Sequence, residues 1–147
     1  MGNVTAEAVG AGYDGDDFYC DVAIPNAALL RVEYEDDWTL AFHHTRPYWQ
    51  NHVVVVPKRH VRSLTTLGDG DADLVRRLLI VIADVARSFE QRDAAASVIT
   101  NLGAYQDSHH LHVHVHSGGR RQGEASSCPP SDAIPLAVSV RRRRTEE

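Results

Sequence analysis

The stretch YQDSHHLHVHVHSGG, from Tyr105 to Gly119, contains five of the chain's nine histidines. Histidine occupies every second position from 110 to 116, with aliphatic residues at 111, 113 and 115. Because alternate side chains of a strand point to opposite faces, the pattern predicts a strand over residues 111–116. Its imidazoles share one face, and its aliphatic side chains face the core. We expect Gly118 and Gly119 to end the strand.

The rest of the chain predicts further strands and one long helix. Alternating or β-branched runs indicate strands at residues 29–36, 38–44, 53–56 and 96–101. We also consider a short strand at residues 136–140. Apolar residues recur at helical spacing after an acidic run that suits a helix N-terminus; they are Leu74, Leu78, Val81, Ile82, Val85 and Phe89. Strands segregated from a single helix indicate an α+β domain with an antiparallel sheet.

Length and composition are typical of one globular domain. The 147 residues carry a net charge of −5, which argues against a surface that coats nucleic acid, despite the basic run Arg141–Arg144. The sequence has no apolar run of the ~18 residues that a membrane span needs, and no secretory signal, so we expect a cytoplasmic protein. We divide the chain into a flexible leader (1–17), a domain (18–119) and a partly flexible C-terminal extension (120–147).

The histidine row has three interpretations. It is an exposed polar face, a metal site, or a set of imidazoles for nucleophilic catalysis. Cys20 and Cys128 are too far apart in sequence for a Cys-x-x-Cys pair, so we do not expect a cysteine-based zinc site. A nucleophilic imidazole needs its Nδ1 proton held by an acceptor, so that the Nε2 lone pair faces the substrate.

Residues elsewhere favour the third interpretation. Gln106 lies four positions before His110, residues 52–60 read HVVVVPKRH, and Asp36-Asp37 is followed by Leu40-Ala41-Phe42. Together these features resemble the histidine-triad (HIT) family of nucleotide hydrolases and transferases. The family signature is Gln-x-x-x-His-φ-His-φ-His-φ-φ, where φ is apolar. The resemblance covers residues 18–119 in the same order.

This resemblance implies both a fold and a reaction. Family members have an antiparallel sheet of about five strands per subunit with one long helix, and the sheet extends across a homodimer. They attack the α-phosphate of a nucleoside phosphoramidate, a dinucleoside polyphosphate or a related nucleotide ester through a nucleotidyl-histidine intermediate. We therefore expect a small-molecule nucleotide substrate, no cofactor, no bound metal, no membrane partner and no specific nucleic acid.

The Gln106 spacing assigns the nucleophile to His112. The resemblance implies that His110 orients it, with the His110 carbonyl accepting the His112 Nδ1 proton. His114 is then expected to donate to the α-phosphate, and His52 to complete the cluster. His116 stands at the final apolar position of the signature, outside the triad.

Other residues match the family's substrate-binding positions. These are Asn101 and Gln106 at the phosphates, Ser108 near the leaving group, and Leu40 and Phe42 at the base. His44-Thr45 stands where many members carry an aspartate that binds the ribose. Asp107 stands where many members carry a hydroxyl that assists the leaving group, and we expect the Asp107 carboxylate to face away from the phosphates.

Two alternative functions remain open: a catalytically weak nucleotide-binding module, and a histidine-rich zinc-binding protein.

Overall fold

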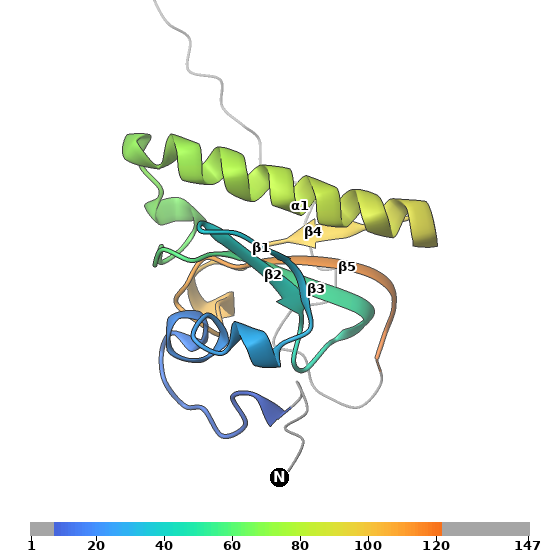
Figure 1. Cartoon of the computed structure of the whole chain (residues 1–147), viewed down its shortest axis with the longest axis horizontal. Coiled ribbons are helices and arrows are strands. Elements are labelled where there is room, and N and C mark those ends of the chain that lie inside the picture. The colour runs from blue at the N-terminus through green and yellow to red at the C-terminus, as the bar shows by residue number, and fades with distance from the viewer. Residues whose placement is uncertain (1–7, 122–147) are drawn as a thin grey trace, which may run out of the picture.

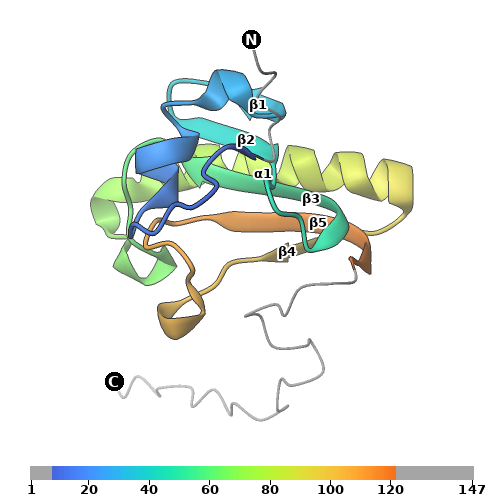
Figure 2. The same ribbon diagram turned by 90° about the horizontal axis from the view of Figure 1, so that it is seen from below.

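A computed structural model describes residues 8–121 and contains a five-stranded sheet with one long helix. The strands are β1 (Val32–Glu35), β2 (Thr39–His43), β3 (Trp49–Pro57), β4 (Ser97–Ile99) and β5 (Val113–Arg120), and the helix is α1 (Ala72–Asp93). The spatial order is β1-β2-β3-β5-β4, and every neighbouring pair is antiparallel (Figure 2). The predicted α+β class and antiparallel sheet are confirmed.

The sheet is covered differently on its two faces (Figure 1). Helix α1 packs on one face, where Val53 and Val55 of β3 meet the apolar stripe of the helix. The N-terminal helical segments, Tyr19–Ala23 and Ala27–Leu29, cover part of the other face against Val54 and Val56. The alternation of a strand therefore separates the four consecutive valines into two cores.

All six apolar residues that recur at helical spacing in the sequence are buried in helix α1. It ends at Asp93, and the next residue, Ala94, caps it: the φ of Ala94 is 61°, in the left-handed region, and its N–H donates to the Glu90 carbonyl. This is an ordinary way to satisfy a carbonyl in the last turn of a helix.

The histidine strand differs from the prediction at both ends. It begins at Val113, so His110 and His112 precede it, and it continues through Gly118 and Gly119 to Arg120. The two glycines do not end the strand because Gly118 lies opposite a register shift in β3. Its φ is +80°, and a Cβ there would lie 2.4 Å from the Gln50 Oε1 atom. The glycine therefore permits a bulge and a close contact.

The N-terminal part of the described chain lies against the sheet. Val9 and Tyr19 are buried in the core beside β2 and β3, and the helical segments after Phe18 were not predicted.

The division into leader, domain and extension stays a prediction. The considered strand at 136–140, Cys128 and the Arg141–Arg144 run lie outside the described residues. Within residues 8–121, no helix has the length and apolar character needed to cross a membrane.

Candidate active site

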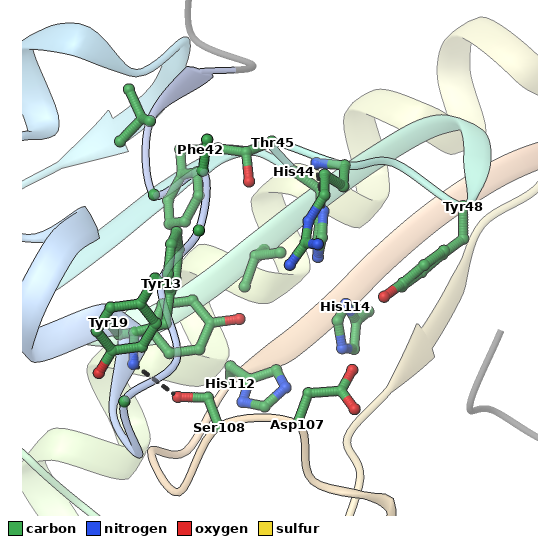
Figure 3. Close-up of a pocket in the computed structure, with 18 residues that line it drawn as sticks. Tyr13, Tyr19, Phe42, His44, Thr45, Tyr48, Asp107, Ser108, His112 and His114 are labelled. Carbon is green, nitrogen blue, oxygen red and sulfur yellow. Dashed lines mark hydrogen bonds between the residues drawn. The ribbon is translucent and has the colours of Figure 1, made fainter. Parts of the chain in front are cut away.

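A cavity of about 370 Å³ opens on the sheet face away from α1 (Figure 3). Three segments line it: the N-terminal segment, the chain around the β2–β3 connection, and the loop before β5. The lining includes Tyr19, Phe42, His44, Thr45, Arg46, Tyr48, Asp107, Ser108, His112 and His114. The volume falls in the ~300–1,000 Å³ range of small-molecule sites.

His112 is held as a neutral imidazole. Its Nδ1 atom lies 2.7 Å from the His110 carbonyl oxygen, which can only accept, so Nδ1 carries the proton. The Nε2 atom of the neutral ring therefore keeps its lone pair. The ring is buried and packs on Tyr19 with 4.9 Å between ring centroids. Burial lowers the pKa of His112, although the His110 carbonyl and the nearby Asp107 oppose that shift.

His110 stands behind the cavity and fixes the carbonyl that His112 uses. Its ring is fully buried, with Nε2 2.8 Å from the Pro57 carbonyl oxygen and Nδ1 3.1 Å from Asp17 Oδ2. Burial alone would raise the pKa of Asp17, but hydrogen bonds from Cys20 and His110 lower it to about 2. Asp17 is thus a carboxylate that links the N-terminal segment to the triad.

A hydrogen-bond chain sets the tautomer of His114. The Tyr48 backbone N–H donates to His52 Nδ1 over 3.2 Å, so a neutral His52 carries its proton on Nε2. His52 Nε2 lies 2.8 Å from His114 Nδ1, which must then accept. His114 consequently carries its proton on Nε2 and offers an N–H donor. Burial, followed by repulsion from neighbouring histidines, lowers the pKa of both rings, that of His114 to about 3.

His44 supplies a second neutral donor beside this pair. The Arg46 backbone N–H donates to His44 Nδ1 over 3.0 Å, which leaves the His44 proton on Nε2. The ring stacks on His52 with centroids 4.4 Å apart. Burial, His112 and the Arg46 charge lower the pKa of His44 to about 4.

The structure brings together only some of the predicted substrate-binding residues. Phe42, His44 and Ser108 line the cavity, and the Ser108 hydroxyl accepts from the Phe18 backbone N–H over 3.0 Å. Leu40, Asn101 and Gln106 are absent from its described lining. Leu40 is a core residue, and the Gln106 side chain donates to the Arg62 carbonyl over 2.8 Å.

Several lining residues were missed because they lie in segments without a recognisable sequence pattern. Tyr13 and Tyr19 belong to a segment without clear periodicity, and Arg46 and Tyr48 to the β2–β3 connection. Asp107 was expected to face away from the site, but it lines the cavity beside His112 (Figure 3). That expectation was wrong. One signal could have identified Arg46: it lies two residues after His44, which stands where many family members carry a ribose-binding aspartate.

His116 is set apart from the other histidines of the row. Its ring stacks on Trp49 with centroids 3.6 Å apart, and its buried Nε2 atom has no hydrogen-bond partner among the described residues. It does not line the cavity. The stacking supports placing His116 outside the triad.

Two groups of side chains have the composition of metal sites. Asp17, Cys20, His60 and His110 form one group, and His44, His52 and His114 form the other, with potential ligand atoms within 4.8 Å of one another. Nitrogen, sulfur and carboxylate donors of this kind suit zinc. Cys20 therefore has potential co-ligands in space, which the spacing argument overlooked. Protein hydrogen bonds already engage members of each group, and the expectation of no metal stays a prediction.

The buried histidines predict an acid-sensitive fold. In the unfolded chain they titrate near the ordinary value of about 6.5, whereas the folded pKa is about 4 for His44 and about 3 for His114. Below pH ~6.5 the unfolded state therefore binds more protons. The free energy of unfolding should be highest above that pH and fall toward the folded pKa values, by up to about 1.4 kcal/mol per pH unit for His114.

Urea unfolding followed by circular dichroism at about pH 7.5, 6 and 5 measures this dependence. His114→Asn should weaken it, because the variant has one fewer group that takes up a proton on unfolding. A free energy of unfolding that did not change between about pH 7.5 and 5 would contradict the prediction.

Comparison with known proteins agrees with this geometry. The family model described as "Scavenger mRNA decapping enzyme C-term binding" matches residues 18–126. An uncharacterized HIT-like protein of Mycobacterium tuberculosis is 35% identical over 99 residues, which are 66% of this chain and 67% of that protein. HINT4 of Arabidopsis thaliana, a bifunctional adenosine 5'-phosphosulfate phosphorylase/adenylylsulfatase, is 31% identical over 110 residues, 71% of each chain.

Solved structures give the same assignment. A histidine triad protein from Clostridium difficile superposes with a TM-score of 0.60 at 31% identity, covering 76% of this chain and 98% of that one. A HIT family hydrolase from Legionella pneumophila, at 24% identity, shares the fold with a TM-score of 0.61 over 70% of this chain and 93% of its own. The matched domain, the ordered triad and the sheet that carries it together show that this chain belongs to the histidine-triad family.

Proposed function

We propose that the chain is a nucleotide hydrolase or nucleotidyl transferase in which His112 attacks the α-phosphorus of a nucleotide ester, anhydride or phosphoramidate. The hydrogen bond from His112 Nδ1 to the His110 carbonyl carries the proposal, because it leaves the Nε2 lone pair as the nucleophile. Membership of the histidine-triad family supports this class of reaction.

The reaction then has two steps. The Nε2 lone pair of His112 forms a bond to the α-phosphorus, while the bond to the leaving group breaks and its electron pair departs with that group. The His112 ring keeps its Nδ1 proton and becomes positively charged, and the His110 carbonyl stabilises that charge. In the second step water, or another acceptor, attacks phosphorus, loses a proton to solvent, and returns the electron pair to Nε2.

Neutral donors are suited to the developing negative charge. The Nε2–H groups of His114 and His44 would donate to the non-bridging oxygens of the α-phosphate, where charge accumulates. Because both donors are fixed by backbone-anchored hydrogen bonds, they need no reorganisation during the reaction. This arrangement requires no metal ion.

The apolar side of the cavity suits the nucleoside. Phe42, Val54 and Tyr19 form an apolar wall on which a base could pack, and Thr45 also lines the cavity. The name of HINT4 describes action on adenosine 5'-phosphosulfate. This relationship supports testing adenylyl compounds first, beside dinucleoside polyphosphates and phosphoramidates.

Covalent labelling of His112 tests the function. Incubation with an α-labelled adenylyl substrate, followed by rapid denaturation, should leave label on the wild type and none on His112→Asn. Turnover by that variant should fall by roughly the 10⁴-fold or more seen when a covalent nucleophile is lost. His43→Asn is the control, since His43 pairs with Glu33 away from the cavity.

Each other outcome excludes the proposed reaction. Binding of the nucleotide without label or turnover would indicate a nucleotide-binding module. Failure to bind nucleotide, together with tight zinc binding that the His114→Asn variant loses, would indicate a zinc-binding protein.

The pH dependence of the rate provides a second test. Neutral His112 is the reactive form, and burial lowers its pKa below the ordinary value of about 6.5. We therefore expect kcat/KM to stay level from pH ~8 down through pH ~6.5 and to fall only in more acidic solution. A rate that continued to rise below pH ~5 would exclude a neutral imidazole nucleophile.

We also infer a homodimer that uses the exposed apolar residues of α1 and β4. Leu79 and Ile80 are 58% and 49% exposed on the helix, and Val98 is 50% exposed on the edge strand. These apolar residues lie on two elements that contact each other (Figure 1). An exposed apolar patch beside a strand edge suits association of two copies.

Sedimentation equilibrium tests this assembly. The wild type should sediment at about twice the chain mass, and Val98→Asp should shift it toward the monomer. Val32→Asp, on the opposite edge strand, is the matched control and should stay dimeric. A wild type that is monomeric at all concentrations would contradict the inference.

A further inference from the structure

A second cavity, of about 200 Å³, lies beside the active-site cavity. The two cavities share His44 and Thr45 as lining residues. The second cavity is also lined by His52, whose Nε2 atom lies 2.8 Å from His114 Nδ1. A group bound in the second cavity would therefore be a neighbour of the active-site histidines.

Three arginines from distant parts of the chain line this second cavity. Arg31 immediately precedes β1, Arg92 lies in the last turn of α1, and Arg121 follows β5. Figures 1 and 2 show the ends of α1 and β5 at the same end of the sheet as the β2–β3 connection. The helix is joined to the sheet there, because Asn51 Nδ2 donates to Asp93 Oδ2 over 3.1 Å. The fold thus brings three guanidinium groups to one place.

The lining of the second cavity is positively charged. Its described residues include three arginines and no carboxylate. Asp93 pairs with Arg92 and compensates that charge. In the part of the chain that the structure describes, neither Arg31 nor Arg121 forms an ion pair with a carboxylate. Two guanidinium charges are therefore available to an anionic ligand.

The side chain of Arg121 is held in place by the start of β3. Its Nε and Nη2 atoms donate to the Trp49 and Gln50 carbonyl oxygens over 3.2 Å and 3.5 Å. A guanidinium has further N–H donors, which remain for a ligand. Burial, then the neighbouring histidines, then the charge of Arg121 lower the pKa of His52. The charge of Arg121 therefore acts at the boundary of the active site.

Size and charge both favour a phosphate group as the occupant. A volume of about 200 Å³ is below the ~300–1,000 Å³ of sites that enclose a whole small molecule. The cavity thus suits one group of a larger ligand. Arginine binds phosphate oxygens with paired N–H donors. A phosphate monoester carries a charge of about −1.5 to −2 at pH 7, which matches two uncompensated guanidinium groups.

We propose that the second cavity binds a phosphate monoester on the ribose of a nucleotide whose base and α-phosphate occupy the active-site cavity. This inference rests on the proposed function, which places the base on Phe42 and the α-phosphorus at His112. The ribose joins these two groups, and His44 and Thr45, which both cavities share, closely follow Phe42 in the chain. A phosphate on the 2'- or 3'-hydroxyl then extends into the second cavity.

A charged binding site away from the reacting phosphorus complements the neutral donors beside it. Burial lowers the pKa of His44 and of His114, so these rings donate hydrogen bonds without attracting an anion over a distance. Arg31 and Arg121 supply that long-range attraction. Binding energy from a group that does not react can also orient the group that does.

Calorimetry with three nucleotides tests the inference. We compare AMP, adenosine 3',5'-bisphosphate and adenosine 2',5'-bisphosphate, which differ only in the ribose phosphate. One bisphosphate should bind the wild type about tenfold or more tightly than AMP, because charge-assisted hydrogen bonds form in the second cavity. The favoured isomer identifies the hydroxyl.

Three variants locate the source of this gain. Arg31→Gln and Arg121→Gln should each reduce it and leave the affinity for AMP unchanged. Arg31 is exposed and forms no ion pair with a described residue, so its substitution separates the loss of charge from any loss of structure. Arg87→Gln removes the same charge from the exposed face of α1 and is the matched control, which should keep the full gain.

Turnover and salt provide independent readouts. We compare kcat/KM for adenosine 5'-phosphosulfate with and without a phosphate on the hydroxyl that calorimetry identifies. The wild type should prefer the ribose-phosphorylated form, and Arg31→Gln should lower that preference without changing the rate on the other substrate. Because the arginines are exposed, raising potassium chloride from about 0.05 to 0.5 M should also reduce the preference.

Three results would overturn the inference. The first is equal affinity of the wild type for AMP and both bisphosphates, and the second is a gain that Arg31→Gln and Arg121→Gln leave unchanged. The third is binding of inorganic phosphate to the AMP complex with an affinity like that of the bisphosphate, lost in Arg31→Gln, which would assign the cavity to a free phosphate ion.

This proposal and the proposed function fail in different ways. Absence of the covalent label on His112 would overturn the nucleophilic mechanism, while the calorimetric comparison needs no turnover and would still decide whether a ribose phosphate is bound. Label on His112 together with equal affinity for AMP and the bisphosphates would leave the reaction intact and overturn the role of the second cavity.

Discussion

The hydrogen bond from His112 Nδ1 to the His110 carbonyl is the interaction on which the site depends. It selects one tautomer of a buried ring and leaves the Nε2 lone pair available. The carbonyl itself is fixed because the His110 ring is held from both sides, by the Pro57 carbonyl at the end of β3 and by Asp17 in the N-terminal segment. Three separate parts of the chain thus determine the protonation of one imidazole.

The sheet supplies the second half of this arrangement. In the β3–β5 pair, Val54 lies opposite His114 and His52 opposite His116, so alternation keeps the histidines of both strands on one face. The face toward α1 is filled with valines, and the helix buries it. The three imidazoles on these two strands would repel one another if they were all protonated. Burial lowers the pKa of His52 and of His114, and the hydrogen bond between these two rings suits their neutral forms.

Sequence patterns predicted the features that depend on residues close together in the chain. The apolar repeat predicted α1, and the resemblance to the histidine-triad family implied the contact between His112 Nδ1 and the His110 carbonyl that the structure contains. Contacts between distant segments left no such pattern. Asp17 contacts His110, although the two residues are 93 positions apart in the sequence. The Gln106 side chain donates to the Arg62 carbonyl and does not line the cavity.

The start of β5 explains why the nucleophile precedes the strand. The ladder with β3 begins at Val113, so the His110 carbonyl lies outside it and is available to accept from the His112 ring. In a regular ladder, backbone carbonyls are largely committed to a neighbouring strand. The irregular segment is nevertheless tied down, because the Leu111 N–H donates to the Val61 carbonyl over 2.6 Å and the Thr100 hydroxyl donates to the His112 carbonyl over 2.8 Å. These two anchors take the place of strand pairing, so the backbone at the nucleophile is fixed while the carbonyl it needs stays out of the sheet.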